Sequence, residues 1–214
     1  MKRYTIEQIT EAVRIKYNEH PVDTGEMILT PDDIELETLI KSNITSAYRF
    51  SVLNAEASML EGKQLEDGSA FTIDANLVGH LALPSDFLRG ITSRLSSWQS
   101  SAKEIIEENS PEYRMQSDPY ACGTPQQPVV ALVFASKGKE LEFYKANSGT
   151  DTLRSFVYVP SLSEAASSGL GNIEIPDQLT EPFIYYIAAL TATTFREDVA
   201  NDFFKVARSL LGIE

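Results

Sequence analysis

Two histidines and one cysteine are the side chains of this 214-residue chain that best suit acid–base or nucleophilic chemistry. A thiol becomes a nucleophile when a nearby base removes its proton and a third group orients that base. Cys122 stands in the loop-type sequence Pro-Tyr-Ala-Cys-Gly-Thr-Pro, and the sequence leaves His80 open as its base. No cysteine-protease signature surrounds Cys122. The pattern therefore favours structural roles for Cys122, for His80 in a predicted strand, and for His20 at a predicted helix end.

Two adjacent carboxylate pairs, Glu107–Glu108 and Asp32–Asp33, are the next candidates, because paired carboxylates serve general acid–base catalysis. Adjacent acids are also what solvated surfaces and helix starts contain, and we adopt that interpretation. The nucleophile elbow, the glycine-rich phosphate loops, the zinc-protease motif and the calcium loop are absent from the sequence. The sequence predicts a protein that is not an enzyme, with no catalytic, cofactor-binding or metal-ligating residue and no cofactor.

The charge balance is acidic along the whole chain. Eighteen Lys and Arg against 31 Asp and Glu give a net charge of -13. No basic patch stands out, which argues against tight binding to nucleic-acid phosphates. One cysteine excludes an intrachain disulfide. No apolar run reaches the ~18 residues of a membrane helix, and the N-terminus lacks the apolar core of a secretory signal. We therefore expect no membrane partner.

Helical signals lie at both ends of the chain. Thr5 and Gln8 form a capping box ahead of a helix predicted over 6–19. Thr30 followed by Pro31 predicts a second helix that runs to about residue 61, where Gly62 stops it. Apolar residues at helical spacing predict two further helices, which begin near 180 and near 197.

The middle of the chain has a different texture, with most of the prolines and several short β-type runs separated by turn residues. This pattern predicts an antiparallel meander, with strands at 71–77, 79–83, 91–98, 129–134, 141–144 and 156–160. Residues 161–175 are rich in Ser, Ala and Gly, as in a linker loop. The fold class we predict is α+β, a four-helix bundle built from both chain ends with an inserted antiparallel β-rich module. The predicted parts are N-terminal helices at 1–64, the β-rich module at 65–160, the linker at 161–175 and C-terminal helices at 176–214.

The most distinctive segment is Leu83-Pro84-Ser85-Asp86-Phe87-Leu88-Arg89. Proline ends a strand here and fixes a backbone angle, and Ser85 or Asp86 caps the turn that follows. We expect the two apolar residues after the turn to be buried and Arg89 to pair with Asp86. The segment then forms a tight corner between two strands, and nothing in it requires catalysis.

This segment resembles a strand end found in head–tail connector (adaptor) proteins of tailed bacteriophages. The similarity continues through the sequences at 105–113, 118–120, 123–125, 128–132 and 141–144. The sequence at 175–179 then opens a C-terminal helical pair that contains Tyr-Tyr-Ile-Ala-Ala-Leu at 185–190. In order and spacing these motifs, which cover about residues 80–212, are similar to the adaptor or tail tubular ring protein of short-tailed phages, with the crAss-like group as a plausible subgroup.

The resemblance carries a set of expectations. It implies no catalytic residue, and a ring, usually of twelve copies, that binds beneath the portal protein and extends the DNA channel towards downstream tail or ring proteins. It places the protein at the head–tail junction of the virion, after synthesis in the host bacterial cytoplasm. DNA passes through the channel without specific binding. The loop 161–175 is longer than the family pattern, and we expect it to order on assembly.

Two other classes of function stay open on the sequence. The first is a non-catalytic, soluble protein-binding module of cellular origin, which predicts a stable monomer or dimer with one dominant apolar patch. The second is a hydrolase that uses Cys122, which predicts a pocket that also contains His80.

Overall fold

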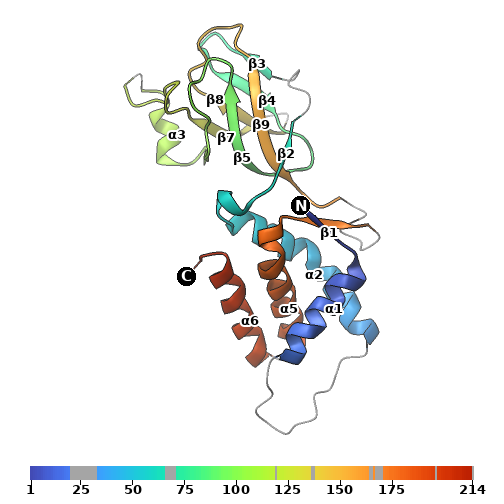
Figure 1. Ribbon diagram of the computed structural model, residues 1–214. Coiled ribbons are helices and arrows are strands. Elements are labelled where there is room, and N and C mark those ends of the chain that lie inside the picture. Colours follow the sequence, from blue (N-terminus) through green and yellow to red (C-terminus); the bar gives the residue numbers. More distant parts are fainter. Residues whose placement is uncertain are drawn as a thin grey trace. The chain divides into compact units, whose positions relative to one another are not determined.

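Two compact units make up the chain in the computed structural model (Figure 1). The structure describes residues 1–19, 33–65, 71–118, 120–135, 138–163, 166, 171–195 and 197–213. The helical unit combines Met1–Glu61 with Ser161–Glu214, and the β module comprises Gly62–Pro160. The predicted starts at Thr30 and Pro31, together with His20 and Asp32, lie outside the described residues.

The helical unit is built from both ends of the chain. Its elements are β1 (Lys2–Tyr4), α1 (Ile6–Glu19), α2 (Asp33–Asn54), the 3-10 turn η1 (Ala57–Met59), β10 (Ile173–Ile175), the 3-10 turn η2 (Asp177–Leu179), α5 (Thr180–Phe195) and α6 (Glu197–Leu210). The capping box at the start of α1 is confirmed, because the backbone N–H of Thr5 donates to Gln8 Oε1 at 2.9 Å and that of Gln8 to Thr5 Oγ1 at 3.4 Å. The second helix is shorter than predicted. It ends at Asn54, whose side-chain amide donates a hydrogen bond to the Phe50 carbonyl at 2.9 Å.

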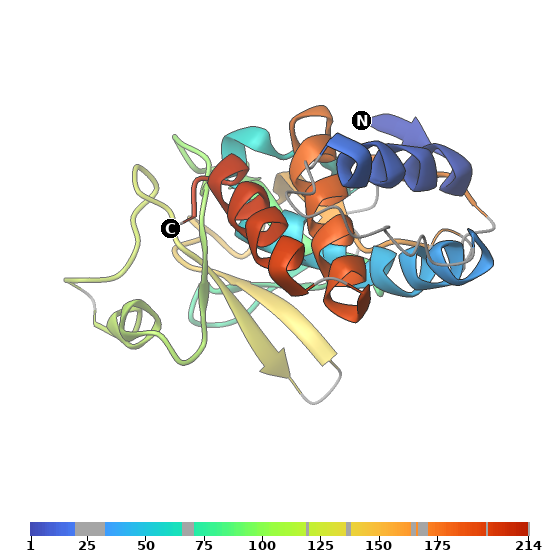
Figure 2. The same ribbon diagram turned by 90° about the horizontal axis from the view of Figure 1, so that it is seen from below.

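The predicted four-helix bundle is wrong. Helix α5 packs extensively on α6 and α2 and less on α1, whereas α1 and α2 barely touch each other (Figure 2). A bundle needs four helices with comparable apolar stripes, but α5 buries residues on nearly every side, among them Phe183, Ile187 and Ala192. A helix that is apolar all round is enclosed by its neighbours. The unit is therefore arranged around one central helix.

A two-stranded sheet ties the chain's first residues to the segment that precedes α5. Strands β1 and β10 pair antiparallel with Lys2 opposite Ile175, and Arg3 Nε donates to Glu174 Oε1 at 2.7 Å. Strand β10 thus occupies the end of the stretch 161–175, which the sequence suggests is a linker loop. Residues 164–165 and 167–170 of that stretch lie outside the described residues.

The β module contains two sheets. Its elements are β2 (Lys63–Gln64), β3 (Phe71–Ile73), β4 (Gly79–Ala82), β5 (Phe87–Leu95), β6 (Ile105–Glu107), α3 (Pro111–Met115), β7 (Val130–Ala135), β8 (Gly138–Phe143) and β9 (Leu153–Pro160). One sheet has the order β2-β9-β5 and the other the order β3-β4-β8-β7-β6. The prediction of a purely antiparallel module is wrong at one place, because β6 pairs parallel to β7. In the described parts of the chain, ten strands in three sheets accompany five helices, so the fold is α+β with sheets dominant.

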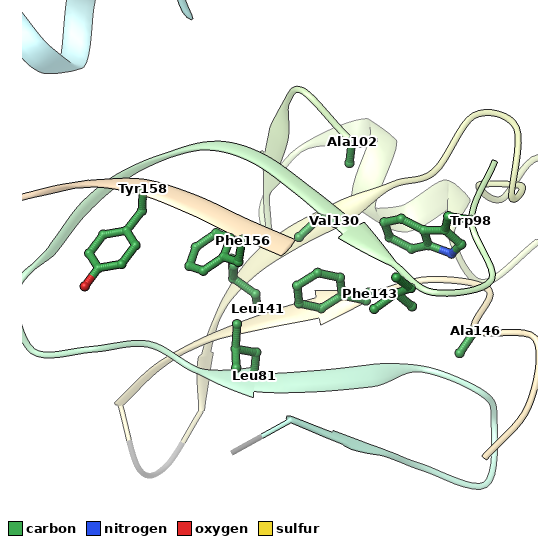
Figure 3. Close-up of a cluster of buried hydrophobic side chains, with 10 residues drawn as sticks. Leu81, Trp98, Ala102, Val130, Leu141, Phe143, Ala146, Phe156 and Tyr158 are labelled. Carbon is green, nitrogen blue, oxygen red and sulfur yellow. The ribbon is translucent and has the colours of Figure 1, made fainter. Parts of the chain in front are cut away.

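Side chains from both sheets meet in one apolar core (Figure 3). Leu81, Leu141 and Phe143 come from the larger sheet and Phe156 from the smaller, and none of these four is exposed to solvent. Trp98, just after β5, packs its ring 5.9 Å from that of Phe143. Burial of each such side chain contributes about 2 kcal/mol to folding. This core fixes the loops and turns from which the candidate site is built.

Candidate interaction surface of the β module

The corner between β4 and β5 is the segment that carries the resemblance to connector proteins. The Phe87 N–H donates to the Pro84 carbonyl at 3.0 Å and closes the turn. Asp86 accepts from Lys63 Nζ at 2.6 Å and from Tyr158 Oη at 3.1 Å, so the predicted pair between Asp86 and Arg89 is wrong. Lys63 reaches Asp86 because β2 pairs with β9, the strand that carries Tyr158. The corner is therefore anchored to the strands β2 and β9.

The protonation of this corner follows from its contacts. Burial opposes ionisation of Asp86, but the hydrogen bonds from Lys63 and Tyr158 outweigh it and hold the pKa of this carboxyl below its usual range. Burial raises the pKa of Tyr158, so its hydroxyl stays protonated and donates. Burial also lowers the pKa of the Arg89 guanidinium. The corner thus holds a charged and hydrogen-bonded arrangement at neutral pH.

The candidate thiol and imidazole do not meet. Cys122 is half-buried in a cleft of about 540 Å³, lined by residues 100–104, 106, 121–124 and 126–129. His80 is not among them. It lies on β4, with Nδ1 2.6 Å from Glu140 Oε1 and Nε2 3.8 Å from Asp74 Oδ2. The geometry therefore gives no support to a hydrolase built on Cys122 and His80.

The acidic pair at the end of β6 has a structural contact. Glu108 Oε2 accepts from the backbone N–H of Phe134 at 3.1 Å, and the Glu108 N–H donates to the Leu132 carbonyl at 3.2 Å. The carboxylate therefore occupies the edge of β7 where β6 has ended. Of the other pair, Asp32 lies outside the described residues and Asp33 is the first residue of α2.

The hairpin of β7 and β8 projects beyond the rest of its sheet (Figure 2). Strand β6 pairs with β7 only as far as Leu132. Strand β4 pairs with β8 from Glu140 onward, and the Leu83 N–H that follows β4 donates to the Lys139 carbonyl at 3.2 Å. The far end of the hairpin forms a two-stranded ribbon, and its Phe134 side chain is 69% exposed. Phe134 also lines a cleft of about 460 Å³ with Glu107, Glu108, Asn109 and Leu132. Sequence reasoning predicted the two strands and the turn between them but not their projection, which depends on where the neighbouring strands stop.

The sequence analysis also did not predict a cluster in which the hydroxyls of Tyr113 and Tyr144 bind the Glu142 carboxylate. Tyr144 Oη donates to Glu142 Oε2 at 2.5 Å, and Tyr113 Oη donates to the same oxygen at 3.2 Å. Burial and this carboxylate raise the pKa of Tyr144, and burial raises that of Tyr113, so both hydroxyls stay protonated. The cluster borders a cleft of about 590 Å³ beneath α3. A signal was present, because alternate residues Glu142 and Tyr144 of a strand point to the same side.

Metal and membrane sites find no support in the described part of the chain. Among those residues, no three His, Cys, Asp or Glu side chains lie close enough together to hold a metal ion. No described helix is both long and apolar enough to span a bilayer. The features of the β module that could serve binding are an anchored corner, a projecting ribbon and clefts lined by both polar and apolar residues.

Comparison with protein-family models and curated proteins does not assign this chain to a family. Neither the protein-family models nor the curated proteins contain a match to this chain. The resemblance to connector proteins therefore rests on the motifs quoted from the sequence.

Proposed function

We propose that this chain is a structural, non-enzymatic subunit of the head–tail connector of a tailed bacteriophage. In this proposal the subunits form a ring of twelve copies beneath the portal protein and contact downstream tail or ring proteins on the opposite side. The ring extends the DNA channel at the head–tail junction of the virion, after synthesis of the subunit in the host cytoplasm.

The projecting ribbon of β7 and β8 is the observation that carries this proposal. A phenyl ring exposed on a projecting ribbon is a liability for a protein that remains alone in solution. Phe134 is 69% exposed on this ribbon, and the described residues of the same module also expose Tyr120 and Met115. A ring subunit buries such groups against its neighbour, because every copy presents the same two surfaces to the next.

The placement of the motifs agrees with this proposal. The sequences at 83–89, 105–113, 128–132 and 141–144 all fall in the β module. They form the anchored corner, strand β6 with α3, and the strands of the ribbon. The sequence at 175–179 forms the turn that leads into the central helix α5. The motifs thus mark the parts of the chain that shape its surfaces.

The acidic balance suits a channel that DNA crosses. A lumen lined by carboxylates repels phosphate, whereas each basic contact adds an attraction that must be broken as the DNA moves. With a net charge of -13, we expect DNA to pass without specific binding. A lumen lined mainly by lysine and arginine in an assembled ring would contradict this part of the proposal.

Two variants of Phe134 test the ribbon's role in assembly. Phe134→Ser removes the apolar group and is expected to weaken assembly about tenfold or more, whereas Phe134→Leu keeps an apolar side chain and retains most of it. Assembly on the portal ring of the same phage is measured by native mass spectrometry, and the copy number in purified virions by quantitative mass spectrometry. Wild-type protein that is absent from virions would overturn the proposal. Protein that forms a stable monomer with or without the portal would favour the cellular protein-binding module instead.

A further inference from the structure

The cleft beneath α3 gathers two cations in an acidic protein. Its volume is about 590 Å³, and its lining includes Asn76, Tyr113, Arg114, Ser117, Tyr144 and Lys145. Neither the Arg114 guanidinium nor the Lys145 ammonium forms an ion pair or hydrogen bond with any described residue. No described carboxylate lines the cleft. On a chain of net charge -13, such a pair of unneutralised cations marks a place for an external anion.

The backbone that carries Lys145 is held in an unusual conformation. Lys145 has φ 63° and Leu77 has φ 61°, and these are the two non-glycine residues with positive φ in the described chain. Residues that carry a Cβ rarely adopt this conformation, because it brings the Cβ close to the backbone. Hydrogen bonds maintain it, because the buried Trp98 Nε1 donates to the Lys145 carbonyl at 3.1 Å and the Ala146 N–H donates to the Leu77 carbonyl at 3.0 Å. The base of the Lys145 side chain is therefore fixed at the cleft.

Arg114 also projects from a fixed element. Ser110 caps α3 by accepting from the Tyr113 N–H at 3.2 Å. The ring of Tyr113 lies edge-on to that of Tyr144 at 6.4 Å, and its hydroxyl bonds to Glu142. Both cations thus extend from positions that need no rearrangement before a ligand arrives, which lowers the entropic cost of binding.

The local charge favours a single carboxylate. Arg114 and Lys145 contribute two positive charges to the lining. Two carboxylates lie behind the lining, because Glu142 accepts from the hydroxyls of Tyr113 and Tyr144 and Asp74 accepts from the Asn76 side chain and the Val78 N–H. With these two carboxylates behind them, the two cations match a singly charged carboxylate better than a phosphate dianion. Nucleic acid is bound by longer tracks of cations. The Asn76 amide, which uses one N–H on Asp74, has a second N–H that can donate to a carboxylate.

We propose that this cleft binds an aspartate or glutamate side chain of an acidic segment from a second copy of the chain, an inference that rests on the proposed ring. In a ring each interface joins two different patches of the same protein. The complement to a cationic cleft is a carboxylate, and this chain supplies 31 acidic residues. Ion pairs of this kind select the partner and the register of the contact.

Crosslinking with a zero-length carbodiimide tests the contact directly. The reagent joins an amine to a carboxylate as an amide, with loss of water to the carbodiimide, only where the two groups touch. Rings assembled from mixed ¹⁵N-labelled and unlabelled protein are expected to yield mixed-isotope crosslinks at Lys145, which are necessarily between copies. Lys103, an exposed lysine of the same module that does not line this cleft, is expected to yield few.

A pair of matched variants measures the contribution of the cations. Arg114→Gln with Lys145→Gln is expected to weaken association at least about tenfold and to reduce its dependence on salt. Lys103→Gln with Arg154→Gln removes the same charge from the same module and is expected to assemble as the wild type does. Urea titration followed by Trp98 fluorescence shows that both variants remain folded.

The outcomes separate this inference from the proposed function. Rings that form without mixed-isotope crosslinks at Lys145, and that tolerate the Arg114 and Lys145 substitutions, overturn the cleft while the ring stands. A Lys145 crosslink in a dimer, with no ring in the presence of the portal, supports the cleft and overturns the ring. Protection of Lys145 from the reagent by a short single-stranded oligonucleotide, but not by a hexaglutamate peptide, would identify phosphate as the ligand and contradict the inference.

Discussion

Replacement of Asp86 by alanine tests how the corner between β4 and β5 is held. The substitution removes the acceptor of two hydrogen bonds, from Lys63 and from Tyr158. The side chains of the ion pair are 51% and 37% exposed, so water screens the pair and it contributes about 0.5 kcal/mol. The bond from the buried tyrosine contributes about 1 kcal/mol. We expect the free energy of unfolding of the β module to fall by about 1.5 kcal/mol.

Trp98 makes this loss measurable in the full chain. It is the one tryptophan and lies in the core of the β module, so its fluorescence in a urea titration reports that unit. Ser85→Ala is the matched control, because this exposed neighbour has no side-chain hydrogen bond among the described residues and is expected to shift stability by less than about 0.5 kcal/mol. Equal urea midpoints for Asp86→Ala and Ser85→Ala would refute the reasoning.

Acid provides a second test of the same corner. Because the folded pKa of Asp86 lies below its usual range, the stabilisation is present above the ordinary aspartate pKa of about 4 and is lost as pH falls through the folded pKa. The difference between wild type and Asp86→Ala should therefore shrink between about pH 6 and about pH 3. A double-mutant cycle with Lys63→Met is expected to give a coupling of about 0.5 kcal/mol that salt reduces.

Three further substitutions test other parts of the structure. Gly62→Ala places a Cβ 2.6 Å from the backbone oxygen of Tyr158, so the urea midpoint followed by Trp98 fluorescence should fall by the equivalent of about 1–3 kcal/mol. Gly149→Ala, with open space around it, should leave that midpoint nearly unchanged, and equal effects of the two substitutions would contradict the packing at Gly62. Asp151, 9% exposed, accepts hydrogen bonds from Ser96, Ser97 and backbone N–H groups, and these outweigh its burial and hold its pKa below the usual range. Asp151→Asn should lower the free energy of unfolding by about 2 kcal/mol near neutral pH and by less below about pH 4. A loss that does not depend on pH would argue against an ionised Asp151. The ring centroid of Phe203 lies 5.6 Å from that of Tyr17 and 6.1 Å from that of Tyr185, so Phe203→Ala should lower the free energy of unfolding of the helical unit by about 3–5 kcal/mol, measured by far-UV circular dichroism. A loss no greater than that of Val206→Ala, at a site 37% exposed, would contradict this packing.

Local signals in the sequence predicted the elements that depend on a few neighbouring residues. The capping box at Thr5 and Gln8 predicted α1. Short apolar runs bounded by turn residues predicted β4, β7 and β9 to within a few residues. These features depend on backbone hydrogen bonds and turn chemistry that act within one or two helical turns.

The sequence analysis did not predict features that depend on residues far apart in the sequence. Strand β1 has only three residues, Lys-Arg-Tyr, and it forms because β10 pairs with it from the far end of the chain. The Asp86 partners Lys63 and Tyr158 lie 23 and 72 residues away in the sequence. An unalternating run of three residues has no periodicity from which a strand is predicted. The nearest cation in the sequence, Arg89, was therefore the wrong choice.

The four-helix bundle failed for a related reason. Amphipathic stripes show that helices bury a face, but they do not say against which partner. The residues of α5, Phe-Ile-Tyr-Tyr-Ile-Ala-Ala-Leu from 183 to 190, are nearly continuous in apolar character, which is typical of a central helix rather than of one corner of a bundle. This apolar run was present in the sequence, and the packing of α5 against α6, α2 and α1 shows that it belongs to a central helix.

Native mass spectrometry with negative-stain imaging tests the central claim most directly. The purified protein is measured at high concentration, alone and then with the portal ring of the same phage. The proposal predicts rings of twelve subunits, each of 23.7 kDa, in at least the second setting, since a portal template supplies the geometry that closes the ring. A monomer in both settings would contradict a connector subunit.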